Sequence, residues 1–206
     1  LWVGWFGFNA GSNLEASGGA ALAMTNSFVA TAAAALAWMF AEWIIKGHPS
    51  MLGALSGAVA GLVAVTPAAG FSGPMGAIVL GLVVGIVCLF FCTVIKNALG
   101  YDDSLDVFGV HCVGGIIGAI GTGIVVDPAL GGAGIVDYTT GMSVYPGLAT
   151  QVVAQLKGVG VTLLWSGIGS IIVFFILKLV VGLRVAEPTE REGLDVAEHG
   201  ERAYTY

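Results

Sequence analysis

The stretch Asp106-Val-Phe-Gly-Val-His-Cys-Val-Gly-Gly-Ile-Ile-Gly-Ala-Ile-Gly-Thr-Gly-Ile-Val-Val126 decides the class of this protein. It is almost wholly apolar and long enough to cross a bilayer, which takes about 20 such residues. His111 interrupts it, and a titratable ring at membrane depth usually faces a bundle interior, a cavity or a permeation path. Because histidine binds and releases protons near neutral pH, the stretch predicts a membrane protein that passes a small, proton-linked solute.

The composition of the whole chain favours the same class. Hydrophobic residues make up 57% of the 206, charged residues 10%, and the mean hydropathy is +0.94. A soluble domain carries about 25% charged residues. The seven Lys and Arg residues form no basic face, so no nucleic-acid partner is expected. Cys88, Cys92 and Cys112 lie in apolar spans, which favours packing over a ligand pair or redox couple, and no metal or cofactor is predicted.

Apolar runs divide the chain into one truncated span and five further spans. The first run has neither an initiator Met nor a charged start, so it is interpreted as the end of a span that began upstream. Pro67 should end the third run early, which makes that helix short. The predicted spans are 1–11, 20–45, 50–68, 73–96, 105–126 and 155–183.

Positive charge falls on alternate loops, which predicts the orientation. Lys46, Lys96 and Arg184 follow alternate spans, and that side should be cytoplasmic. The chain is therefore expected to form a transmembrane bundle over 1–184 in the cell membrane and a cytoplasmic tail over 185–206. The loop 127–150 should face outside.

Glycines four residues apart predict closely packed helices. The pairs Gly57 and Gly61, and Gly81 and Gly85, place small residues on one face of each span. Such faces let helix backbones approach in a membrane.

Two polar or aromatic clusters are candidates for chemistry. Trp5, Phe8 and Ser12 lie where a span meets the outer face, and are interpreted as either an interfacial aromatic belt or a cation site. Asp102, Asp103, Ser104 and Asp106 precede His111, and capping of the helix start is favoured over a transport role for these acids. A structural histidine that donates to a backbone carbonyl is the alternative to a pore role for His111.

These clusters are similar to the ammonium transporter (Amt/Rh) family, above all its bacterial members, and the resemblance extends along the whole chain. The matching strings are Gly4-Trp-Phe-Gly-Phe-Asn-Ala-Gly-Ser12, Thr66-Pro-Ala68, Asp102-Asp-Ser-Leu-Asp-Val-Phe-Gly-Val-His111, Val181-Gly-Leu-Arg-Val185, Glu190-Arg-Glu-Gly-Leu-Asp195, His199-Gly-Glu201 and Ala203-Tyr204.

The resemblance implies an all-α polytopic helical bundle and no enzyme. Family members have eleven spans, built as two inverted five-helix repeats plus a long last helix, and form homotrimers with one pore per subunit. This chain would cover the end of the sixth span through the eleventh. The first repeat would be missing.

The resemblance also implies roles for individual residues. His111 matches one of two pore histidines, whose partner belongs to the missing half, and Phe8 matches one of two stacked phenylalanines that close the outer mouth. Ser12 matches the hydroxyl of the outer ammonium site and Trp5 a pore-lining tryptophan. Thr66 is a weaker match, near the pore at a broken helix end.

Two further implications concern a departure from the family pattern and the tail. Cys112 stands where family members commonly have glycine, which affects local packing. The tail strings resemble the docking element for trimeric PII-type nitrogen regulatory proteins. Its candidate residues are Glu190, Arg191, Gly193, Asp195 and His199.

The implied mechanism binds ammonium outside, removes its proton and passes ammonia through a hydrophobic pore, with the histidines helping to relay the proton. Electrogenic and neutral transport both stay open. The alternatives are a neutral gas channel of the Rh type, an ammonium sensor that signals through its tail, and an intramembrane enzyme. The tail of about 20 residues is short for a signalling domain. Glu42, essentially the one intramembrane acid, lies near a helix end, which argues against an enzyme.

Overall fold

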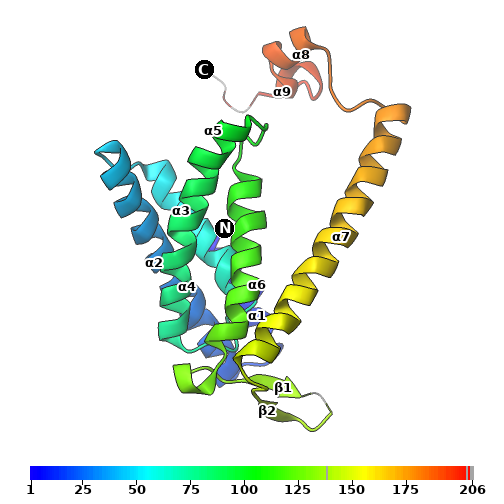
Figure 1. The fold of residues 1–206 in the computed structure, drawn as a ribbon. Helices are drawn as coiled ribbons and strands as arrows, with labels where there is room; N and C mark the ends of the chain where they lie inside the picture. Colours follow the sequence, from blue (N-terminus) through cyan, green and yellow to red (C-terminus); the bar gives the residue numbers. More distant parts are fainter. Residues whose placement is uncertain (138, 203, 205–206) are drawn as a thin grey trace. The chain divides into compact units, whose positions relative to one another are not determined.

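Helices make up nearly all of the regular structure in the computed structural model, which describes residues 1–137, 139–202 and 204 (Figure 1). Two compact units, Leu1–Val159 and Gly160–Tyr206, divide the chain. The helices are α1 (Trp2–Gly11), α2 (Gly18–Lys46), α3 (Met51–Val65), α4 (Pro74–Phe90), α5 (Lys96–Leu99), α6 (Val113–Val125), α7 (Leu148–Val180), α8 (Glu187–Glu192) and α9 (Leu194–Ala197), with π-helical turns at Phe91–Ile95 and Phe108–Cys112 and a short 3₁₀ turn at Pro128–Leu130.

Each of the six predicted spans corresponds to a helix. Four of them, Gly18–Lys46, Pro74–Leu99, Phe108–Val125 and Leu148–Val180, are long and apolar enough to cross a membrane. The third span is the shorter helix α3, which ends at Val65, before Pro67, as expected. The helical bundle that the sequence predicts is therefore confirmed.

The last span begins earlier than predicted. Helix α7 starts at Leu148 rather than at 155 and ends at Val180, just before Gly182 adopts φ +90°. The prediction placed the start of this span at the first residue of the apolar run. That start is too late because Gln151, which precedes the run, is polar yet buried in the bundle. Its backbone lies against Gly123 of α6, where no side chain intervenes.

A β-hairpin occupies the predicted loop 127–150 and is the one departure from the all-α expectation in the described residues. Strand β1 (Ile135–Asp137) pairs antiparallel with β2 (Met142–Val144), Ile135 opposite Val144. Asp137 accepts hydrogen bonds from the hydroxyl and, at 2.9 Å, the backbone N–H of Thr139. These bonds, the hydroxyl's first, lower the pKa of Asp137 and hold the chain at the end of β1.

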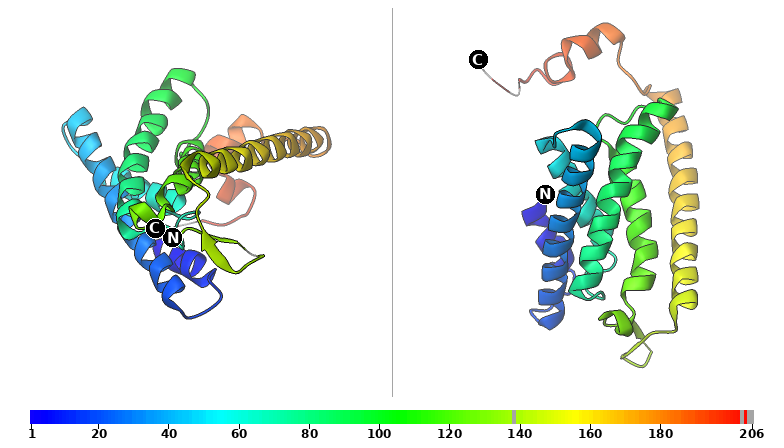
Figure 2. Two further views of the ribbon diagram at one scale, coloured as in Figure 1. Left: turned by 60° about the horizontal axis from the view of Figure 1, so that its bottom comes forward. Right: turned by 60° about the vertical axis from the view of Figure 1, so that its left-hand side comes forward.

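The core of the first unit is built around α2. Helices α2, α3, α4 and α6 lie side by side in Figure 1 and in both views of Figure 2. A Cβ atom on Gly61 of α3 would lie 2.6 Å from the Ala30 carbonyl oxygen, and one on Gly85 of α4 would lie 2.5 Å from that of Ala34. The two glycine helices therefore both approach the backbone of α2 closely at Ala30 and Ala34, as their spacing predicts.

Replacing Gly61 with alanine should destabilise the protein, although alanine is the better helix former. The added methyl group would overlap the Ala30 carbonyl, and overpacking of this kind costs about 1–3 kcal/mol. Thermal unfolding of the purified protein in detergent measures the loss as a lower Tm. Gly115→Ala is the matched control, because its nearest contact would be an ordinary 3.9 Å to Val63. Equal melting temperatures for the two variants would contradict the close packing.

Candidate functional site

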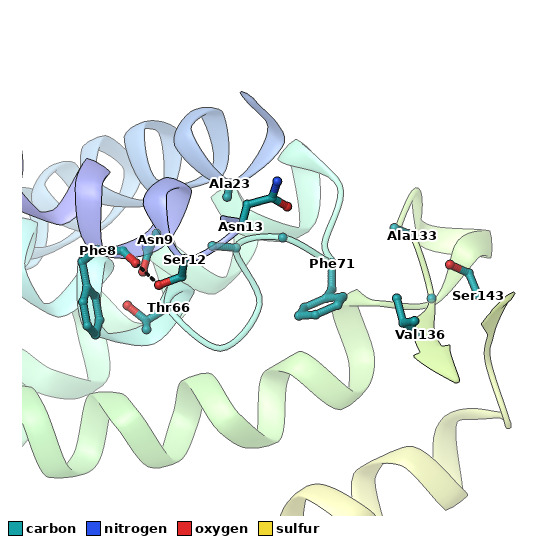
Figure 3. Close-up of a pocket in the computed structure, with 13 residues that line it drawn as sticks. Phe8, Asn9, Ser12, Asn13, Ala23, Thr66, Phe71, Ala133, Val136 and Ser143 are labelled. Atoms are coloured by element: carbon teal, nitrogen blue, oxygen red, sulfur yellow. Dashed lines mark hydrogen bonds between the residues drawn. The ribbon is translucent and has the colours of Figure 1, made fainter. Parts of the chain in front are cut away.

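A pocket of about 460 Å³ opens where the C-terminal end of α1 meets the end of α3 and the hairpin segment (Figure 3). Figure 3 places the Phe71 ring between the Ser12 side of this pocket and the hairpin residues Val136 and Ser143. The lining residues with polar or aromatic side chains are Phe8, Asn9, Ser12, Asn13, Thr66, Phe71 and Ser143.

Three of the predicted site residues, Phe8, Ser12 and Thr66, line this pocket, and Trp5 contacts two of them from behind. Trp5 donates from Nε1 to the Thr66 hydroxyl at 2.9 Å, which joins α1 to the end of α3. The rings of Trp5 and Phe8 meet edge to face with centroids 5.6 Å apart. Ser12 lies one turn further along α1, and its hydroxyl donates to the Phe8 carbonyl oxygen at 2.5 Å. Sequence-distant strings therefore form one wall.

The hydroxyl groups of this wall have no proton left to offer a ligand. Ser12 donates to Phe8, and Thr66 donates to the Leu62 carbonyl at 2.7 Å. A hydroxyl has one proton and two lone pairs, so both groups present only lone pairs to a further partner. Such a wall suits a ligand that donates hydrogen bonds. The same bond to the carbonyl four residues earlier is made by Thr25, Ser27, Thr31, Thr93 and Thr122.

Asn26 fixes the opposite wall of the pocket and was missed in the sequence. It is fully buried in α2 and donates from Nδ2 to the carbonyls of Ala69 and Ser72 at 2.8 and 2.7 Å. The carbonyl of Phe71, in the same link, accepts from the backbone N–H of Ala133 at 2.7 Å, which attaches the segment before β1. An amide side chain in an apolar helix was the available signal.

His111 lies away from this pocket, in a second recess of about 740 Å³ that Tyr101, Asp102 and Phe108 also line. Its side chain is exposed and belongs to the π-helical turn Phe108–Cys112. Turns of this kind are frequent at functional sites. Among the described residues no hydrogen bond to the His111 ring is found, so the bond expected of a structural histidine is not formed there.

The acidic cluster fixes the start of the helix that carries His111. The Asp103 carboxylate accepts from the backbone N–H groups of Val107 and Phe108 at 2.8 and 2.9 Å, which is capping geometry. Asp106, at φ +55°, pairs with Lys96 at 2.8 Å. Lys96 also donates to the Asp103 carbonyl, so it ties the end of the preceding span to this helix start.

The predicted tail residues lie in a separate segment of the second unit. Glu190 and Arg191 belong to α8, and Gly193, at φ +106°, separates it from α9, which contains Asp195. His199 follows α9. Arg191 pairs with Glu187 at 2.6 Å, but both side chains are exposed, so the pair contributes about 0–1 kcal/mol.

Comparison with known proteins identifies relatives along the whole chain. A sequence profile described as the Ammonium Transporter Family matches residues 1–204. Over 204 residues the chain is 51% identical to an ammonium transporter of Aquifex aeolicus, covering 99% of this chain and 46% of the relative. The ammonium transporter of Bacillus subtilis is 41% identical over 204 residues, with 99% and 49% covered.

Solved structures resemble the fold as well. One described as a "Sensor Amt Protein" shares 31% identity and a TM-score of 0.83, covering 96% of this chain and 46% of that chain. Mep2 from Candida albicans shares 31% identity and a TM-score of 0.80, with 91% and 41% covered. The chain thus spans about half the length of the curated relatives it matches.

Proposed function

Because the chain belongs to the ammonium transporter family, we propose that it is the second half of a membrane transporter for ammonium and ammonia. The chain is a membrane protein, as its apolar helices and its family both indicate. The family is one of transporters rather than enzymes, and the resemblance drawn from the sequence strings is confirmed.

The lone pairs of the pocket at the end of α1 are the observation that carries the proposal. Ammonium has four N–H donors and no acceptor, so it complements hydroxyls whose protons are already used by Phe8 and Leu62. Phe8 adds an aromatic face that attracts a cation by about 0.5–2 kcal/mol. Its side chain is 59% exposed and therefore accessible to a ligand. Ammonium is captured here.

The bound ammonium ion loses a proton first, and the resulting ammonia then passes through the pore. An unpaired ion in a hydrocarbon-lined path meets a penalty of many kcal/mol, whereas neutral ammonia does not. Thr66 lines the capture pocket and is held by Trp5, which we assign to the pore lining next to it, and Phe8 gates the pore. His111 lies on the narrow path, with a histidine of the other half as its partner, and takes part in relaying the proton. Asp103 and Asp106 keep the His111 helix in place.

Ser12→Ala should weaken ammonium capture more than it lowers the maximal rate. The variant removes an acceptor that contacts the bound cation, and a hydrogen bond to a charged group contributes about 1.5–3 kcal/mol. The half-saturation concentration of the ammonium-driven current should therefore rise about tenfold or more in proteoliposomes that contain the full-length protein. Thr25→Ala is the matched control, because its hydroxyl makes the same bond to its own helix at an exposed position that does not line the pocket.

An interfacial belt would behave differently. If Ser12 served only to anchor α1 at the membrane surface, the variant would reduce the amount of protein and leave the half-saturation concentration unchanged. That result would remove Ser12 from the capture site. Absence of any ammonium-driven flux in the unaltered protein would refute the proposed function itself.

The orientation and partners proposed here follow from charge and family. The protein lies in the inner membrane of the cell and its pocket faces outside. The segment 185–206 is a cytoplasmic tail. The full protein is a homotrimer, and its tail docks a PII-type nitrogen regulatory protein. The alternating placement of Lys46, Lys96 and Arg184 supports this orientation.

An ammonium sensor is the second candidate function. The similarity to a structure described as a "Sensor Amt Protein" favours it. In a sensor, the capture pocket would bind ammonium without net transport. Flux and binding measured on the same proteoliposomes separate the two. A sensor would bind ammonium at the Ser12 pocket and give no sustained current, whereas a neutral Rh-type channel would move ammonia with no current but with a pH change.

A further inference from the structure

Asn9 is a buried amide on the wall of the capture pocket. It belongs to α1, is 8% exposed and lines the pocket together with Ser12. The two residues are three positions apart, so they lie on the same face of the helix. A buried amide in an apolar span is costly unless its polar atoms have partners, which makes its hydrogen bonds informative.

The orientation of the Asn9 amide is determined by Ser27 on α2. The Ser27 hydroxyl donates its single proton to the Ala23 carbonyl at 2.7 Å. It can therefore only accept from Asn9, and the Asn9 Nδ2 atom lies 2.8 Å from it. The flipped amide would place two acceptors against each other. Ser27 thus fixes which end of the amide faces the pocket.

The carbonyl oxygen of Asn9 is the end that remains. None of the donors in the described part of the chain bonds to it. The buried side-chain atoms that lack a partner there are Asn26 Oδ1 and the Tyr101 hydroxyl oxygen, and Asn9 Oδ1 is not among them. Asn9 Oδ1 is therefore accessible. The rest of Asn9 is enclosed by the protein, and the residue lines the pocket.

We propose that Asn9 Oδ1 is a second acceptor for bound ammonium beside Ser12, and that Ser27 is the positioning residue that aims it. The inference rests on the proposed function and assigns the pocket a substrate class. Ligands with two or more N–H groups engage both acceptors, whereas a cation with a single N–H engages one. The pocket thereby distinguishes ammonium from heavily methylated amines.

The test measures current in proteoliposomes that contain the full-length protein, with ammonium as substrate and trimethylammonium as competitor. Asn9→Leu should raise the half-saturation concentration of ammonium about tenfold. The inhibition constant of trimethylammonium, which has one N–H, should change less than about twofold because it needs only one acceptor. A merely structural role for Asn9 would shift both constants together.

Ser27→Ala should raise the ammonium constant in the same direction by a smaller factor, because the amide is no longer held. Thr25→Ala is the matched control: its hydroxyl makes the same bond to its own helix, to Ala21, but the residue is exposed. Unchanged ammonium constants in Asn9→Leu, or equal shifts for both cations, would overturn the proposal. If Asn9→Leu does not reach the membrane, an unchanged constant in Ser27→Ala overturns it. These outcomes count only if the unaltered protein gives an ammonium-driven current. If it gives none, the proposed function fails instead.

Discussion

Replacing His111 with leucine is expected to lower the ammonium-driven current of the full-length protein at least about a hundredfold, the lower range for losing a proton-transfer group. The leucine fills a similar volume but carries no proton. His111 is exposed, lies in a π-helical turn of a membrane-spanning segment and faces an open recess. An ionisable side chain in that setting usually belongs to a substrate or proton path.

His48→Leu provides the control for this experiment. His48 is exposed in the link between α2 and α3, outside the apolar spans, so the same chemical change there should leave the current intact. Both variants are compared at equal amounts of protein in the membrane. The size of the purified oligomer shows whether each variant still assembles. A normal current in His111→Leu would show that the imidazole takes no part in transport, and His111 would have to be treated as structural.

Deleting residues 187–206 is expected to abolish inhibition by a PII-type regulator while basal transport continues. The deletion removes α8 and α9, including the Glu190–Asp195 string that carries the resemblance. Gly193 adopts φ +106° between the two short helices, a conformation that other residues rarely take, so the tail has a defined turn at that point.

The measurement is ammonium-driven current with and without the regulator added on the tail side. Glu198→Gln, an exposed change between the two matched strings, should remain inhibitable. Inhibition of the deletion variant to the same extent as the unaltered protein would place the docking surface elsewhere.

The membrane helices were predictable because a bilayer imposes their length and polarity. Apolar runs located the spans, and Pro67 located the early end of α3. The spacing of Gly61 and Gly85 predicted close approach to a neighbouring helix but not which one. Family resemblance alone assigned Ser12 to the outer site and Thr66 to the vicinity of the pore. That both line one pocket could not be read from the sequence, because residues far apart in the chain share no local pattern.

Other features had weaker signals in the sequence. Strands β1 and β2 are three residues each, too short for an alternating pattern to stand out among glycines. The roles of Asn9 and Asn26 depend on long-range bonds to α2 and to the α3–α4 link. The π-helical turn at His111 depends on packing, since Gly109 lies directly against Cys92 of the other π-helical turn.

The hydroxyls that bond to their own helix have a consequence for proton leakage. A proton hops along a chain of groups only if each one accepts on one side and donates on the other. Ser12, Thr66 and Thr122 donate inward to a carbonyl, so each must break that bond, at about 1 kcal/mol, before it can hand a proton onward. These bonds therefore disfavour hydroxyl-borne proton conduction along the spans, and they favour an imidazole or water as the carrier of a proton that crosses.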